Sequence, residues 1–208
     1  MGKKMTENSK RLSDFELVYL NNSADEFREN HPLPGTINKY FDQLGIELKF
    51  TNTRGNDGES RIVNGKPLVI VNIEQKMKED NDAEMVFSAL HELAHLILDF
   101  GWQDNKSIIR EEDSGIFFEN NQTVFARSQD RNDLTISPVE LRANEWAAAI
   151  MMPRNEVASI IKAEREKGNQ GNSYIIDKIK TKLEVPENFA KNRYESVRRI
   201  LEMEEAGI

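Results

Sequence analysis

The sequence predicts an α+β fold in which a small, mostly antiparallel sheet packs on a helix and further helices follow. Three observations support this. The apolar residues change from helical spacing to strand-like alternation near residue 46, and they return to helical spacing near residue 82. Asn64-Gly65, the commonest sequence for a tight hairpin turn, separates two short apolar runs. Clear cap and stop residues bound the later helices.

Two segments before the sheet are predicted to be helical. The first follows a possible cap at Ser13 or Asp14 and has apolar residues at helical spacing, which suits one or two short helices. The second, "TINKYFDQLG", stops at Gly45, a residue type that often ends helices. Residues 1–12 are predicted to be a disordered tail.

The strands follow from alternation and turn chemistry. "IELKFTN" alternates as a half-buried strand should. "PLVIVN" is continuously apolar, so it is expected in the sheet against a helix. Its Pro67 has no N–H to donate, which favours an edge position. "GIFFENNQTVFARS" predicts a second hairpin that turns near Asn120-Asn121.

Strong helical patterns fill the rest of the chain. One runs from Asp82 to Asp99, and another opens at Ser137-Pro138, where serine suits the N-cap and proline the first helical position. Three more are expected after Pro153. We predict a metal-binding domain over residues 13–168 and a C-terminal helical segment over residues 169–208.

Composition narrows the functional classes. The 208 residues include no cysteine, which excludes a disulfide scaffold, a cysteine nucleophile and a thiolate metal site. The net charge of −8 argues against a large nucleic-acid footprint, and no direct nucleic-acid partner is expected. With no apolar window long enough for a membrane span and no signal peptide, we expect a cytoplasmic protein without a membrane partner.

The helix "FSALHELAHLILDF" carries the clearest chemistry. His91 and His95 are four residues apart, so they lie one turn above each other on one face and can bind one metal ion. Glu92 is turned about 100° round the helix and can reach a water beside the metal. A solvated surface turn is the alternative. The leucine-rich flanks disfavour it, because three buried ionisable groups need partners.

Catalytic zinc sites usually have three protein ligands, so a third is needed. Without cysteine it is most simply a carboxylate, and the helix after Ser137 offers Glu140 and Glu145. Glu140 can bind metal while Asn144, one turn later, accepts a hydrogen bond from the free N–H of a ligand histidine. Glu145 points elsewhere and is expected to be a solvated helix charge. His31 lies in a loop and is expected to be a surface histidine.

These residues carry a family resemblance. "HELAHLIL" followed by "ELRANEWAAAIMMP" resembles the ImmA/IrrE family of intracellular gluzincin-like metallopeptidases, convincingly over Ile46–Pro153. The resemblance implies a zincin-like fold and a Zn²⁺ cofactor. It implies His91, His95 and Glu140 as metal ligands, Glu92 as the catalytic general base and Asn144 as the hydrogen-bond acceptor behind a ligand. It also implies a protein substrate, a DNA-binding repressor of the helix-turn-helix type that controls stress or mobile-element genes.

Other functional classes remain open at this point. A regulatory protein could keep the fold and sequester a transcription factor or toxin partner without cleaving it, although a pure binder has no need of Glu92. Direct DNA binding through the C-terminal helices is a third possibility, and its cations would be Lys191, Arg193, Arg198 and Arg199. If the protein is a peptidase, "PLVIVN" at a sheet edge could pair with an extended substrate. Substrate identity and oligomeric state do not follow from the sequence.

Overall fold

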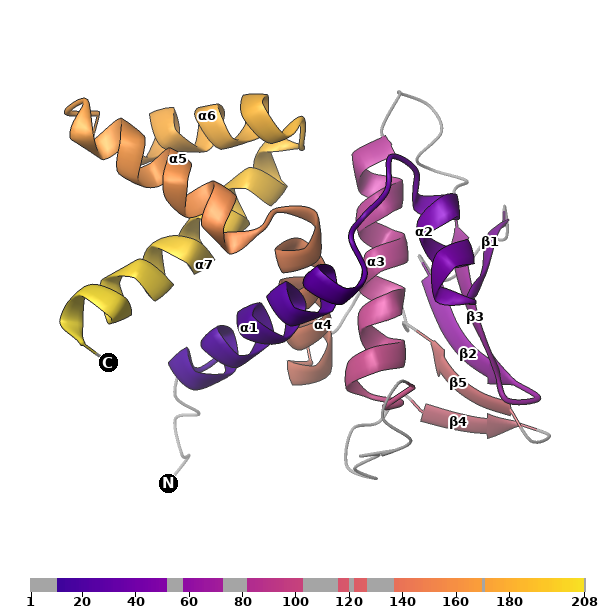
Figure 1. The fold of residues 1–208 in the computed structure, drawn as a ribbon. Helices are drawn as coiled ribbons and strands as arrows, with labels where there is room; N and C mark the ends of the chain where they lie inside the picture. Colours follow the sequence, from indigo (N-terminus) through magenta and orange to yellow (C-terminus); the bar gives the residue numbers. More distant parts are fainter. Residues whose placement is uncertain are drawn as a thin grey trace, which may run out of the picture.

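The computed structural model describes residues 11–51, 58–72, 82–102, 116–119, 122–126, 137–169 and 171–207. Within these ranges the chain forms helices and one five-stranded sheet (Figure 1). The helices are α1 (Asp14–Asn30), α2 (Ile37–Leu44), α3 (Asp82–Leu98), α4 (Pro138–Met151), α5 (Arg154–Glu166), α6 (Asn172–Leu183) and α7 (Glu187–Ala206). The strands are β1 (Glu47–Thr51), β2 (Gly58–Val63), β3 (Lys66–Asn72), β4 (Ile116–Glu119) and β5 (Gln122–Ala126).

The elements stack in layers around α3. The strand order is β1-β3-β2-β5-β4; β1 and β3 are parallel, and the other neighbours are antiparallel. Helix α3 lies between the sheet, which it contacts through β2 and β3, and α4 on its other side (Figure 1). The prediction of an α+β fold with a mostly antiparallel sheet on a central helix is therefore confirmed.

Both predicted hairpins are present. Val63 pairs with Lys66, and between them Asn64 and Gly65 have φ values of 52° and 77°. Two consecutive positive φ values are what a two-residue type I′ turn requires, and they match the twist of the flanking strands. In the second hairpin Glu119 pairs with Gln122. The two asparagines between these partners lie outside the described residues.

The edge position predicted for "PLVIVN" is wrong. Strand β3 lies inside the sheet, between β1 and β2. Pro67 faces Ile62 of β2, whereas the pairing with β1 begins only at Leu68. Proline is therefore tolerated here because it precedes the stretch of β3 that is bonded on both sides. Of the described strands, β1 and β4 form the sheet edges.

Helix boundaries follow the predicted capping chemistry. Ser13 and Glu16 form a reciprocal capping box at the start of α1, and Gly45 ends α2 with a left-handed φ of 70°. At α4 the Ser137 side chain accepts a hydrogen bond from the backbone N–H of Glu140 at 3.3 Å. Such a cap stabilises a helix by about 1 kcal/mol. It also fixes the first turn of α4, which carries Glu140.

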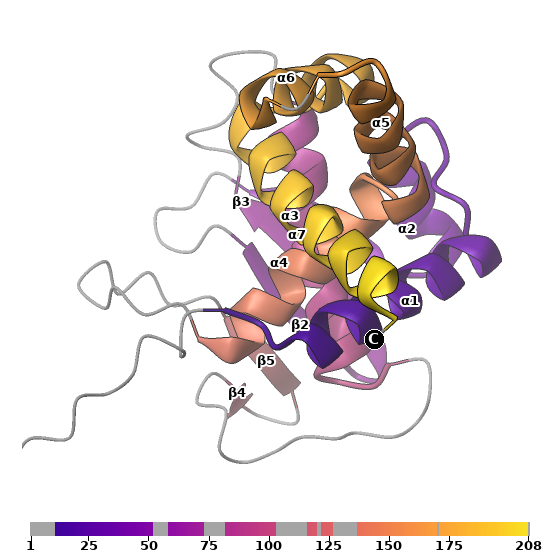
Figure 2. The same cartoon turned by 90° about the vertical axis from the view of Figure 1, so that its left-hand side faces the viewer.

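Two hydrophobic clusters hold the fold together. The first joins α1, α2, α3, α4 and the sheet, with Tyr40, Leu93 and Trp146 fully buried. The second joins the end of α4 to α5, α6 and α7, which lie on the side of the molecule away from the sheet and face the viewer in Figure 2. The domain division at residue 168 stays a prediction, and most of the predicted tail lies outside the described residues.

Within the described parts of the chain, no helix has both the length and the apolar character needed to cross a membrane.

Candidate metal centre

Helix α3 buries its histidines because it is apolar on almost every side. Leu90 and Leu93 have no exposed surface, and His91, Glu92 and His95 are 1%, 2% and 0% exposed. Ionisable side chains at this depth need compensating partners. For the two imidazoles those partners are Glu140 on a neighbouring helix and Asp99, which directly follows α3.

Helix α4 brings Glu140 to the two histidines. The Nε2 atoms of His91 and His95 lie 3.1 Å apart. Glu140 Oε2 is 3.2 Å from His91 Nε2, and Glu140 Oε1 is 3.5 Å from His95 Nε2. A tetrahedral zinc ion with ligand bonds of about 2.0–2.1 Å holds its ligand atoms about 3.3–3.4 Å apart. These two distances involve different oxygens of Glu140; with one ligand atom taken from each residue, all three atoms lie within 4.8 Å of one another, so donor types and spacings fit a divalent cation between them.

Electrostatics within the cluster also favour a cation. Burial alone would raise the pKa of Glu140, but hydrogen bonds from His91 and His95 hold it well below its usual range. Burial likewise would lower the pKa of His95, but Asp99 and Glu140 outweigh it and raise the pKa to about 9. Without metal, the His95 proton supplies the positive charge that the carboxylates demand. A metal ion would take over that role.

Asp99 orients His95 and was not among the residues predicted for the site. Its Oδ2 lies 2.7 Å from His95 Nδ1. Because a carboxylate can only accept, this contact places a proton on Nδ1 and leaves Nε2 to face Glu140 and His91. The signal was available in the sequence, because Asp99 follows His95 at the same four-residue spacing that pairs the histidines.

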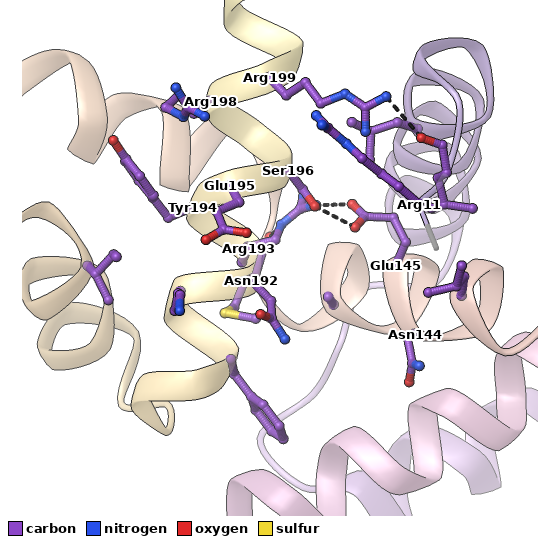
Figure 3. A pocket seen from close by; sticks show the side chains of 18 of the residues that line it. Arg11, Asn144, Glu145, Asn192, Arg193, Tyr194, Glu195, Ser196, Arg198 and Arg199 are labelled. Carbon is purple, nitrogen blue, oxygen red and sulfur yellow. Dashed lines mark hydrogen bonds and ion pairs between the residues drawn. The ribbon is translucent and has the colours of Figure 1, made fainter. Parts of the chain in front are cut away.

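Asn144 does not make the hydrogen bond predicted for it. His95 Nδ1 is occupied by Asp99, and His91 Nδ1 is buried with no hydrogen-bond partner among the described residues. Asn144 instead lines a neighbouring cavity, where its side chain extends from α4 (Figure 3). The correction has a geometric reason: Asp99 directly follows α3, four residues after His95, so no second helix is needed to supply the acceptor.

Glu92 points towards the sheet, where its carboxyl group contacts Gly58 and Ser60 of β2. Ser60 Oγ lies 2.8 Å from Glu92 Oε2 and 2.7 Å from the backbone oxygen of Glu92. A Cβ atom built on Gly58 would come within 2.4 Å of Glu92 Oε1, so only glycine leaves room for this position. Burial raises the pKa of Glu92, although the nearby histidines and Ser60 oppose the shift. A carboxyl whose pKa is raised by burial suits proton transfer near neutral pH.

Comparison with known families agrees with this geometry. A family model described as Peptidase_M78, the IrrE N-terminal-like domain, matches residues 41–195. The chain belongs to this metallopeptidase family. The match begins in α2, includes the whole cluster on α3 and α4, and continues into α7. No curated protein matches the chain.

The other acid considered on α4, Glu145, is not a solvated charge in this Peptidase_M78 domain. It is 8% exposed, and its Oε1 accepts hydrogen bonds from Arg193 at 2.7 Å and Asn21 at 2.9 Å. Ser196 donates to Oε2 at 2.7 Å. The prediction of a solvated role is wrong because α7 and α1 cover this face of α4. Glu145 ties three helices together and lies outside the metal cluster.

Three of the four cations considered for DNA binding pair with carboxylates of the protein itself. Arg193 is fully buried against Glu145 and also donates to the backbone oxygen of Met152 at 2.7 Å. Arg198 pairs with Glu202 at 2.9 Å, and Arg199 pairs with Asp14. These contacts leave no continuous row of unpaired cations on the described face of α7. They weaken the reading of α7 as a DNA-binding helix.

His31 lies at the C-cap of α1, away from the cluster of the Peptidase_M78 domain. Its Nδ1 is 3.2 Å from the backbone oxygen of Phe27, and its ring lies 4.6 Å from the Phe27 ring. The half-buried ring therefore closes the end of a helix.

Proposed function

We propose that this protein is a zinc-dependent endopeptidase that hydrolyses a peptide bond in a specific protein partner. The observation that carries the proposal is the convergence of His91, His95 and Glu140 at spacings suited to one tetrahedral ion. Membership of the Peptidase_M78 family supports the same chemistry. Histidine nitrogen and carboxylate oxygen are donors typical of catalytic zinc.

The ion and the protein divide the work. When bound, zinc supplies Lewis acidity, which polarises a peptide carbonyl and makes water easier to deprotonate. His91, His95 and Glu140 hold the ion, and Asp99 holds His95 in the tautomer that binds. Glu92 accepts the proton of the attacking water and passes it to the nitrogen of the leaving amine. Ser60 and Gly58 fix the position of the Glu92 carboxyl group beside the residues that hold the ion.

The partner we propose is a helix-turn-helix repressor whose cleavage releases transcription. This proposal rests on the family resemblance and on charge. The net charge of −8 favours encounter with a basic DNA-binding protein. Binding without cleavage, which would sequester the partner, remains the competing function, and the two predict different fates for the bound protein.

A cleavage assay separates these functions. The zinc-loaded wild type and the Glu92→Gln variant are each incubated with the candidate repressor, and the products are identified by mass spectrometry. We expect the wild type to cut at a defined bond, and the variant to keep zinc and bind the repressor without cutting it. Cleavage by the variant at the wild-type rate would remove Glu92 from the mechanism. Tight binding of intact repressor by the zinc-loaded wild type would establish sequestration instead.

A further inference from the structure

A cavity of about 790 Å³ opens between α4 and α7, beside the group of His91, His95 and Glu140. Phe87, one turn before His91 on α3, lines it, and so does Asn144, one turn after Glu140 on α4. Phe189 of α7 also lines it and packs against Phe87 in a tilted arrangement with ring centroids 4.5 Å apart. The cavity therefore adjoins the cluster and has a volume typical of ligand sites.

The lining of the cavity contains more cations than carboxylates, although the protein as a whole is acidic. Five cations line it: Arg11, Lys191, Arg193, Arg198 and Arg199. The lining carboxylates are Glu145, both of whose oxygens already accept hydrogen bonds, and Glu195. Arg198 and Arg199 pair with acids outside the cavity lining, whereas Arg11 and Lys191 form no ion pair with any described residue.

Arg193 adds a buried cation to the wall. Its Nε donates to the Met152 backbone oxygen and its Nη1 to Glu145, but its Nη2 has no hydrogen-bond partner among the described residues. The side chain is fully buried and belongs to the cavity lining, between α7 and Glu145 (Figure 3). Its Nη2 has less than 1 Å² of accessible surface, so Arg193 contributes positive charge to the wall rather than a direct contact with a bound chain.

We propose that this cavity binds an acidic, extended segment of the protein substrate next to the bond that is cut. An apolar side chain would lie against Phe87 and Phe189, and carboxylates would follow along α7 towards Arg11 and Arg199. That the bound segment belongs to a substrate rests on the proposed peptidase function, whereas the binding site does not depend on that function. The overall negative charge of the protein favours encounter with a basic partner. The local positive charge of the cavity then selects one acidic segment of that partner.

The length of the wall sets the length of the segment. Phe189 and Arg199 are ten residues apart on one helix, which corresponds to about 15 Å at 1.5 Å per residue. An extended chain advances about 3.3 Å per residue, so about four or five residues would cover this wall. The preferred sequence is thus an apolar residue followed by about three or four positions that favour acidic residues.

Binding of paired peptides to the zinc-loaded Glu92→Gln variant tests the proposal without hydrolysis. The probes are a fluorescent peptide with one leucine followed by five glutamates, the same peptide with five glutamines, and both sequences reversed. We expect the glutamate probe to bind more tightly than its glutamine counterpart in one orientation. Lys191→Glu or Arg11→Glu, added to the variant, should weaken its binding about fivefold. Added salt should reduce the preference.

Lys182→Glu is the matched control, because Lys182 is an exposed lysine on α6 outside the cavity lining and the change in charge is identical. It should leave the affinity for both probes unchanged. Equal binding of the glutamate and glutamine probes would overturn the proposal. An equal loss of affinity for the glutamate probe in Lys182→Glu and Lys191→Glu would also overturn it. If the acidic preference holds but the wild type cleaves no protein, the peptidase function fails while the binding site stands.

Discussion

The hydroxyl of Ser60 lies between two oxygens of Glu92, 2.8 Å from Oε2 and 2.7 Å from the backbone oxygen. Through this contact β2 holds both the helix and the side chain of the proposed base. Gly58 is two residues earlier, on the same face of the strand, and leaves the space that the Glu92 carboxyl occupies. The sheet therefore contributes directly to the geometry of the active-site candidate.

Replacing Gly58 with alanine should displace Glu92 while sparing the metal ligands. The new Cβ would lie 2.4 Å from Oε1 and 2.8 Å from Cγ of Glu92, so that side chain must move. Because a positioned general base contributes about 10²–10⁴-fold, we expect kcat to fall at least about 100-fold. Zinc stoichiometry should stay at the wild-type value, which elemental analysis would measure beside the kinetic assay.

Gly35→Ala is the control for that experiment, since no atom lies within 4 Å of the Cβ it would add. It should keep wild-type kcat. Wild-type activity in Gly58→Ala would show that the proposed base does not need its place against β2.

Asp99→Asn should weaken zinc binding without unfolding the protein. The amide can still contact His95 Nδ1 but no longer offers a full negative charge to the imidazole. Loss of such a partner typically costs about 10–100-fold in metal affinity. Competition with a fluorescent chelator would measure the change. The same substitution at Asp177, an exposed acid on α6, serves as the control. Equal affinities in the two variants would contradict the role of Asp99.

Zinc binding should release a proton near neutral pH. The pKa of His95 is raised to about 9 in the metal-free protein, so its imidazole is protonated there, and zinc needs the neutral form. A raised folded-state pKa also means that this histidine stabilises the metal-free fold most at pH values below about 6.5, its unfolded value. That contribution is lost as the pH rises towards 9. Calorimetric titration with zinc in buffers of different ionisation enthalpy would count the protons, and a buffer-independent enthalpy near neutral pH would contradict the assignment.

The pair formed by Arg193 and Glu145 should dominate the attachment of α7 to α4. Arg193→Ala leaves a buried carboxylate without its guanidinium, which typically costs about 3–5 kcal/mol. Arg198→Ala breaks an exposed pair on α7 and should cost only about 0.3–0.5 kcal/mol. Urea denaturation of the zinc-loaded proteins would compare them. A loss for Arg193→Ala as small as that for Arg198→Ala would show that the buried pair contributes little.

Local signals predicted much of the fold. Asn64-Gly65, Ser137-Pro138 and Gly45 each act through backbone conformation or a nearby hydrogen bond, and each lies where the structure has the expected turn, start or stop. The spacing of His91 and His95 likewise depends only on helix geometry, and the structure brings Glu140 to them.

Long-range relationships could not be predicted in this way. The edge position predicted for β3 from Pro67 is wrong, because the partners of a strand are set by the packing of the whole sheet, to which a single proline contributes little. Glu145 and Arg193 are 48 positions apart, and nothing in either segment indicates that α7 covers α4. Ser60 reaches Glu92 from a different element across 32 positions. Such contacts depend on tertiary packing and leave no periodic trace in the sequence.

The central claim is that one divalent cation is held jointly by His91, His95 and Glu140. Diffraction from zinc-loaded crystals of the whole chain, recorded on both sides of the zinc absorption edge, tests this most directly. The account predicts one strong anomalous peak about 2.0–2.2 Å from His91 Nε2, His95 Nε2 and a Glu140 oxygen. A well-ordered cluster without such a peak, or a zinc ion bound to other residues, would contradict it.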